Sequence, residues 1–300
     1  MIPFQSFQER LTNELQKIEA AILVLWQKSE IEEFRNDPNS GIVFIVHPYY
    51  WKALPIEHRA TQARLLSKYR HWYELFCGCH AHHSSDVRDK IEKTNTDILD
   101  AIELKSDWGT RATFDENRVC LSDNVTIFRH LLEHPLASDT EFTLVPDTNA
   151  LLKSADPSHY GQVIDSASFS FVILPTVLAE LDGLKRNRAA QTLGEKAEKA
   201  IRFIKGFRKQ GSVLDGVTVA KTITVQMIPT EPRMDKLPSW LDPTNQDDRI
   251  IGSVLEIQRA QPSAVVVLVT DDMNLQNKAE MAFLPWAEPP EVNARALAPS

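Results

Sequence analysis

The sequence predicts an α/β protein: a three-layer α/β/α sandwich with a mainly parallel central sheet, preceded by a mostly helical N-terminal domain. Two observations predict this arrangement. Between about residues 142 and 283, short apolar runs rich in β-branched residues alternate with longer segments whose apolar residues recur at helical spacing. Before residue 138, helical spacing predominates. Because alternating strands and helices build parallel sheets covered on both faces, the sandwich is expected in the C-terminal part.

The composition is that of a soluble globular protein. The 300 residues are 43% hydrophobic and 25% charged, which allows one large or two ordinary domains. Three cysteines are an odd number, and the chain starts without a charged-then-apolar leader, so we expect a reducing, cytoplasmic location. The longest apolar runs, residues 20–26 and 264–269, are far shorter than the ~20 residues of a membrane span, and no membrane association is expected.

The N-terminal domain is assigned to residues 1–138. Apolar residues at intervals of three and four predict helices over residues 3–34, 55–76, 86–104 and 125–132. A short strand is expected over residues 42–46 and a loop over residues 105–120. No motif assigns this domain a function, and the hypothesis for it is recognition of a protein partner or self-association.

One cluster in this domain contains residue types that bind zinc: Cys77, Cys79, His80, His82 and His83. Structural zinc sites usually pair two such elements separated by a loop, and Cys120 alone is not a second element. Ordinary thiols and surface histidines at a helix end are therefore the favoured interpretation. Metal binding by the cluster is the alternative left open.

The second domain is assigned to residues 141–290, and residues 291–300 are expected to form a flexible tail. Strands are predicted at residues 142–145, 169–174, 222–228 and 264–270, where β-branched residues are enriched. Helices are predicted from residue 151, again at 160–167, and then at 176–184, 193–207, 246–260 and 273–283. Pro175 stands at the first turn of a helix, where its missing N–H costs little.

Four acidic residues each lie at or near the start of a helix that follows a strand or loop: Asp147, Glu180, Asp248 and Asp272. In a parallel sheet these positions meet at one edge, where α/β proteins bind ligands. Taken singly, each aspartate could simply cap a helix. The adjacent pairs Asp247-Asp248 and Asp271-Asp272 repel, however, unless a cation neutralises them. Such oxygen ligands suit Mg²⁺ or Mn²⁺.

Four segments in this order resemble the PIN-domain ribonucleases: DTNALL, PTVLAELDGLKRN, NQDDRIIGSVLEI and VVVLVTDDMNLQNKA. The resemblance covers about residues 142–290. It implies that the family's catalytic, metal-binding acids correspond to Asp147, Glu180, Asp248 and Asp272. It also implies that Asn149 and Thr270 match the polar residues that surround these ligands. The neighbouring acids Asp182, Asp247 and Asp271 remain alternatives.

The resemblance implies an endoribonuclease that uses Mg²⁺ or Mn²⁺ to hydrolyse single-stranded RNA, leaving a 5′-phosphate and needing no protein nucleophile. Residues 185–210 contain nine Lys or Arg and two acids, in a chain whose net charge is −8. Lys185, Arg186 and Arg188 follow Glu180 closely and are expected to bind phosphates beside the scissile bond. For the lysines further along the chain, a solvated basic helix face is an equally good interpretation.

Other interpretations are weaker. A dinucleotide-binding fold would need G-x-G-x-x-G after its first strand, and a P-loop NTPase would need G-x-x-x-x-G-K-[ST]; neither motif is present. The main alternative is a catalytically silent PIN fold that binds RNA or acts as a scaffold, with partner recognition by the N-terminal domain. The presence of all four acids favours the nuclease, although a fold alone does not establish an activity.

Overall fold

The computed structural model of the chain describes residues 4–33, 48–79, 84–106, 110–133, 141–186, 191–262 and 264–291. The chain forms two compact units, one of Gln8–His134 and one of Met1–Phe7 with Pro135–Ser300. We describe each unit separately. No helix among the described residues is long and apolar enough to cross a membrane.

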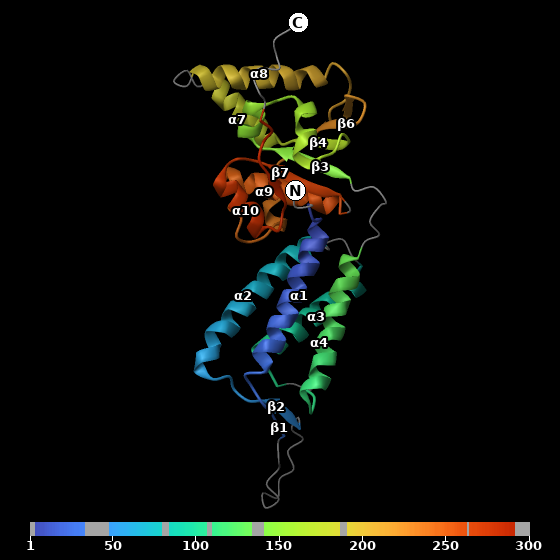
Figure 1. Cartoon of the computed structure of the whole chain (residues 1–300), viewed down its shortest axis with the longest axis vertical. Coiled ribbons are helices and arrows are strands. Elements are labelled where there is room, and N and C mark those ends of the chain that lie inside the picture. Colours follow the sequence, from blue (N-terminus) through green and yellow to red (C-terminus); the bar gives the residue numbers. More distant parts are fainter. Residues whose placement is uncertain are drawn as a thin grey trace, which may run out of the picture. The chain divides into compact units, whose positions relative to one another are not determined.

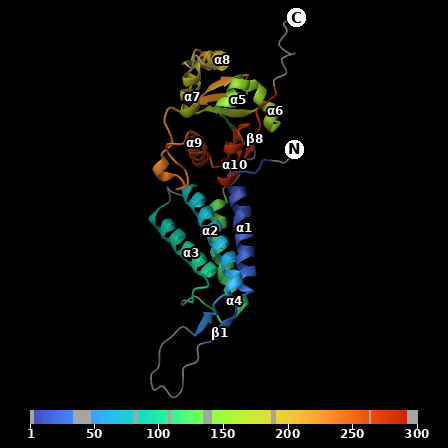
Figure 2. The same ribbon diagram turned by 90° about the vertical axis from the view of Figure 1, so that its left-hand side faces the viewer.

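The first unit consists of helices that lie side by side and a two-stranded antiparallel sheet, as Figures 1 and 2 show. In chain order its elements are α1 (Phe7–Trp26), β1 (Ile31–Glu33), β2 (Tyr49–Trp51), α2 (Ile56–Cys79), α3 (Ser85–Glu103) and α4 (Phe114–Leu132). Trp72 lies at the centre of its core, stacked on Tyr69 and Phe76 and packed edge-on against Phe128. Its indole N–H donates to the carbonyl of Leu11 at 2.8 Å, which ties α2 to α1.

Two expectations for this unit were wrong. Helix α1 ends at Trp26, and the residues after it form the strand β1 rather than more helix. Helix α4 starts at Phe114 within the expected loop, because Thr113 and Glu116 form a capping box. The expected strand over residues 42–46 lies outside the described residues, as do His80, His82 and His83. Cys77 lies within α2, where burial raises the pKa of its thiol.

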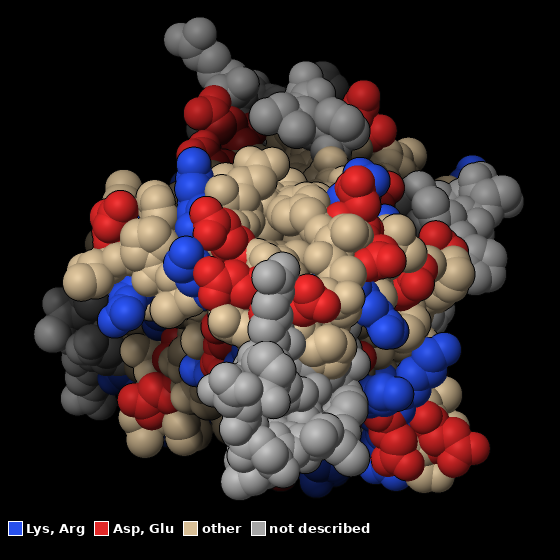
Figure 3. Space-filling view, turned by 90° about the horizontal axis from the view of Figure 1, so that it is seen from below, with Lys and Arg blue, Asp and Glu red and all other residues tan. Residues whose placement is uncertain are grey.

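The face shown in Figure 3 carries charged side chains of both signs. Among the described residues on this face, Lys and Arg side chains lie close to Asp and Glu side chains. Acids and bases at such short range largely cancel one another's field. The described part of this face therefore mixes both signs of charge.

The second unit contains the expected three layers. Its six-stranded sheet has the order β5-β6-β4-β3-β7-β8, and every neighbouring pair except β5 with β6 is parallel. The strands are β3 (Phe142–Pro146), β4 (Phe169–Ile173), β5 (Val217–Val219), β6 (Ile223–Met227), β7 (Val265–Val269) and β8 (Trp286–Ala287). Helices α7 and α8 cover one face of the sheet, and α9 and α10 cover the other (Figure 1).

The helices of this unit are α5 (Thr148–Lys153), α6 (Gly161–Ile164), α7 (Pro175–Arg186), α8 (Gln191–Phe207), α9 (Gln246–Ala260) and α10 (Met273–Met281), with short 3-10 turns at Pro157–Tyr160 and Met234–Lys236. Strand β3 comes first in the chain yet lies between β4 and β7. The strand order therefore reverses at β3, and a ligand site is expected beyond the carboxyl ends of β3 and β7.

Three details of the second unit differ from expectation. The antiparallel strand β5 was not expected, since three residues give too short a pattern to recognise. Strand β8, which pairs with β7, was also not expected. Helix α7 continues through Lys185 and Arg186, beyond the expected end at residue 184.

Candidate functional site

Asp147 follows β3 directly and lies where the strand order reverses. Its side chain accepts a hydrogen bond from the N–H of Ala150 at 2.7 Å, so that it caps α5. Its other carboxylate oxygen, Oδ2, accepts one from the hydroxyl of Thr270 at 2.5 Å, and its N–H donates to the carbonyl of Val269 at 3.0 Å. These bonds join the ends of β3 and β7. The side chain of Asp147 is only 2% exposed.

Burial raises the pKa of Asp147 to about 6, because a carboxylate removed from water is costly to ionise. The hydrogen bonds from Thr270 and Ala150 oppose this effect, while the negative charges of Asp271 and Glu180 add to it. None of these influences is a cation. Asp147 is therefore a buried acid with neighbouring negative charge, and a proton or a bound cation would stabilise it.

Glu180 reaches the same edge of the sheet from α7. Its carboxylate accepts a hydrogen bond from the hydroxyl of Thr148 at 2.5 Å. Thr148 is the first residue of α5 and follows Asp147 in the chain. The structure thus brings the first two predicted acids together, with a threonine holding the second in place.

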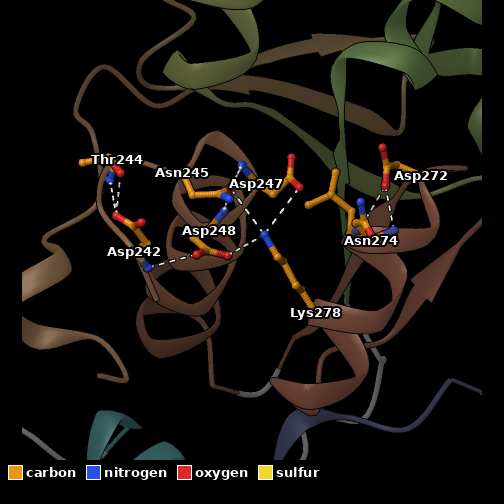
Figure 4. Close-up of polar contacts among 9 residues, drawn as sticks. Asp242, Thr244, Asn245, Asp247, Asp248, Asp272, Asn274 and Lys278 are labelled. Atoms are coloured by element: carbon orange, nitrogen blue, oxygen red, sulfur yellow. Dashed lines mark hydrogen bonds and ion pairs between the residues drawn. The ribbon is translucent and has the colours of Figure 1, made fainter. Parts of the chain in front are cut away.

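Asp248 lies in the first turn of α9 and has a different environment. It is 6% exposed, and both of its carboxylate oxygens are engaged. Oδ1 is 2.7 Å from the ammonium nitrogen Nζ of Lys278, and Oδ2 accepts a hydrogen bond from the N–H of Asp242 at 2.9 Å. Figure 4 shows Lys278 extending from α10 toward Asp248. A cation of the protein itself already neutralises this predicted ligand.

The same ammonium also interacts with two neighbours of Asp248. Its nitrogen lies 3.3 Å from Asn245 Oδ1 and 3.4 Å from Asp247 Oδ2 (Figure 4). The repulsion between Asp247 and Asp248, which suggested a metal ion from sequence alone, is therefore relieved by Lys278. Sequence reasoning missed this lysine because it lies on another helix, and only the packing of α10 against α9 brings it near.

The two acids of the last pair, Asp271 and Asp272, make different contacts. Asp272 caps α10 by accepting hydrogen bonds from the N–H groups of Asn274 at 2.7 Å and Leu275 at 3.3 Å. In Figure 4 it lies apart from the cluster around Lys278. Its own N–H donates to Thr270 Oγ1 at 3.0 Å, so Thr270 links it to Asp147. Asp271 forms an ion pair with Lys153 at 2.5 Å.

The predicted residues thus form two groups rather than one closed set. Asp147, Glu180 and Asp272 are connected at the edge of the sheet through threonines, whereas Asp248 is paired with Lys278. In the parts of the chain that the structure describes, no three His, Cys, Asp or Glu side chains already converge as a metal site. The donors at the edge are nevertheless carboxylate oxygens of the kind that Mg²⁺ and Mn²⁺ prefer. Their chemistry and the uncompensated charge of Asp147 fit such an ion.

The remaining predicted residues lie at the surface. Asn149 is exposed on α5, and Lys185 and Arg186 are exposed in the last turn of α7, beyond Glu180. Arg188 lies outside the described residues. These exposed positions are compatible with contact to a large ligand.

Comparison with known proteins gives a match for the second unit. A family model described as a PIN domain matches residues 144–286, a range that contains all four predicted acids. The human transcriptional protein SWT1 is 26% identical over 164 residues. That match covers 53% of this chain and 17% of SWT1, so the chain spans well under two thirds of this relative.

Replacing Asp147 by asparagine should change the pH dependence of stability. The pKa of aspartate is about 3.9 in an unfolded chain, below the value of about 6 in the folded state, so folding becomes less favourable as the pH rises from about 4 to 6. Asparagine keeps the cap and removes the charge. In EDTA at about pH 8 we expect Asp147→Asn to raise the free energy of unfolding by about 2 kcal/mol, a gain that disappears near pH 4.

Urea denaturation followed by circular dichroism at both pH values measures this difference. Asp182→Asn, a change at an exposed acid of α7, is the control and should show no such dependence on pH. A stability difference for Asp147→Asn that is equal at both pH values would contradict the electrostatic description of this site.

Replacing Lys278 by methionine should destabilise the second unit. Removing one partner of a buried ion pair typically costs ~3–5 kcal/mol, and since Lys278 is 25% exposed we expect about 2–3 kcal/mol. Urea denaturation measures the loss. Adding Asp248→Asn to Lys278→Met should restore most of the lost free energy of unfolding. The control Lys185→Met should change the free energy of unfolding little, because Lys185 is exposed. If the losses in free energy of unfolding for Lys278→Met and Asp248→Asn simply added in the double variant, the ion pair would contribute nothing to stability.

Proposed function

We propose, from the match of a PIN-domain family model to residues 144–286, that the protein is a metal-dependent endoribonuclease acting on single-stranded RNA. The family places this half of the chain in a nuclease superfamily. The observation that carries the proposal is the buried carboxylate of Asp147, which lies at the edge of the sheet beside Glu180 and forms no ion pair with a Lys or Arg among the described residues. Hydrolysis of a phosphodiester is the chemistry that such an acidic site supports when it binds a divalent ion.

The acids proposed to hold Mg²⁺ or Mn²⁺ are Asp147, Glu180, Asp248 and Asp272. When bound, the ion would supply a water of lowered pKa and would neutralise charge on the leaving oxygen. Thr270 and Thr148 fix the carboxylates of Asp147 and Glu180 by hydrogen bonds, so that few rotamers remain to be ordered on binding. Asp248 would join them only by giving up its ion pair with Lys278.

The RNA strand is proposed to contact Lys185, Arg186 and Arg188. The first two are exposed on the helix that carries Glu180, and five residues of helix separate Lys185 from Glu180 by about 8 Å along the axis. Cations at that separation can bind phosphates flanking the scissile bond and position the strand without reading its sequence.

A second function is favoured by the ion pair between Asp248 and Lys278. Because a protein cation already neutralises one of the four acids, the fold could bind RNA or act as a scaffold without cutting. The first unit, which the PIN-domain model does not cover, would then recognise a protein partner or a second copy. A cytoplasmic location is proposed for either function, and the free thiols of Cys77 and Cys120 support it.

Cleavage of an end-labelled single-stranded RNA by the full chain tests the proposal. We expect cutting with Mn²⁺ or Mg²⁺, none in EDTA, and a loss of at least about a hundredfold in rate for Asp147→Asn, which removes charge without removing the helix cap. Asp182→Asn is the matched control: Asp182 lies on the same helix as Glu180, but it is exposed, and it is Glu180 that Thr148 holds at the acidic edge.

The outcomes separate the two functions. Cleavage by Asp147→Asn at the rate of the unchanged protein would refute the assignment of the site. RNA binding without metal-dependent cleavage by the unchanged protein would favour the silent binding module.

A further inference from the structure

Helix α8 has one buried and one exposed face. Its apolar residues pack into the second unit, where the buried ones are Ala197, Ala200, Ile201, Ile204 and Phe207. Its other face is exposed and basic. The exposed cations of α8 and of the turn that follows it are Lys196, Lys199, Arg202, Lys205, Arg208 and Lys209. The amphipathic pattern is sufficient for packing, so packing does not explain why Lys and Arg outnumber acids on the outer face.

This charge is poorly neutralised. With Lys185 and Arg186, eight exposed Lys or Arg lie within the described part of residues 185–210, against the acids Glu195 and Glu198. Among these described residues the ion pair found is that of Arg202 with Glu198, at 3.3 Å and in solvent, where such a pair contributes little. The face shown in Figure 3, by contrast, mixes both signs. A polyanion would complement the outer face of α8.

An aromatic ring lies within this basic face. Phe203 is 42% exposed, although a phenylalanine gains most from full burial. On the helix surface it lies one turn beyond Lys199 and two turns beyond Lys196. Its ring is 5.4 Å from that of the buried Phe207 and nearly perpendicular to it, at 87°. An exposed aromatic face beside cations is the arrangement that binds unpaired bases by stacking.

The helix is also well placed relative to the acidic edge. It packs against α5, which begins directly after Asp147, and against α7, which carries Glu180, and Figures 1 and 2 show α8 lying along α7. Its seventeen residues span about 25 Å. A strand that leaves the acidic edge over Lys185 and Arg186 would continue onto α8.

We propose that the outer face of α8 is a binding track for single-stranded RNA, in which Phe203 stacks on a base while Lys196, Lys199 and Arg202 contact phosphates. The choice of RNA as the polyanion rests on the proposed function. The track itself requires no metal and no cleavage. Through this track the enzyme would bind several nucleotides beyond the cleaved bond, whatever their sequence.

Self-association through α8 is disfavoured by the same charges. Two copies related by a two-fold axis would bring like faces together, so that Lys199 and Arg202 of one copy would meet basic residues of the other. Burying uncompensated cations in this way is costly. A single strand of RNA, whose bases can reach Phe203, fits the face better than a duplex, whose bases are paired and stacked.

The test is equilibrium binding of the full chain to a fluorescent oligouridine of about 12 nucleotides in EDTA, which prevents cleavage. We expect Phe203→Ala to weaken binding about tenfold and Phe203→Trp to retain it, since tryptophan keeps an aromatic face. We expect Lys196→Gln with Lys199→Gln to reduce the slope of log affinity against log salt by about 1.4. Lys28→Gln with Lys90→Gln, two exposed lysines of the first unit, is the matched control and should leave the slope unchanged.

Several results would overturn the proposal. They are equal affinity of Phe203→Ala and the unchanged protein, a salt slope unaffected by the two substitutions in α8, or a change of oligomeric state in Phe203→Ala by size-exclusion chromatography. The last result would show that α8 binds a second copy. Binding lost in these variants while the unchanged protein cuts no RNA would support the track and refute only the nuclease.

Discussion

The hydrogen bond between Thr270 and Asp147 is the interaction on which the site depends. It joins the ends of β3 and β7, where Pro146 and Val269 are in register, and it fixes a carboxylate that is removed from water. Because Thr270 also accepts from the N–H of Asp272, one hydroxyl orders the starts of both α5 and α10. The chemistry proposed for the second unit requires this edge to stay rigid.

Two acidic groups near this edge are stabilised by different means. Asp247 and Asp248 share the ammonium of Lys278, so their charge is balanced within the fold. Asp147 has hydrogen bonds but no ion pair among the residues that the structure describes, and the negative charges of Asp271 and Glu180 make its ionisation still harder. Since burying an unpaired charge is costly, the fold tolerates this acid at the expense of stability. Such a cost is typical of functional sites.

Much of this fold follows from local sequence. The alternation of apolar strands and helices predicted the parallel sheet. Helix α9 was located because it is long enough to show a helical period, and β7 because it is a continuous run of buried apolar residues. The start of α4 was missed although Thr113 and Glu116 form a recognisable capping box. The short strands β5 and β8 depend on pairing with neighbours rather than on local pattern.

The candidate site was only partly predictable. The positions of the acids after strands follow from topology, which is why Asp147 and Glu180 could be expected at one edge. The ion-pair partner of Asp248 could not be predicted, since Lys278 follows it by thirty residues in the sequence and lies on another helix. Local sequence does not distinguish an acid that is paired within the fold from one that is not.

The most direct test of this account is equilibrium binding of Mn²⁺ to the full chain by electron paramagnetic resonance, with Asp147→Asn and the control Asp182→Asn. The account predicts that the unchanged protein and the control bind the ion alike. It predicts that Asp147→Asn weakens binding at least about tenfold, because this change removes a buried carboxylate that no Lys or Arg of the described residues neutralises. Equal binding by all three proteins would contradict the account, since the ion would then be held elsewhere.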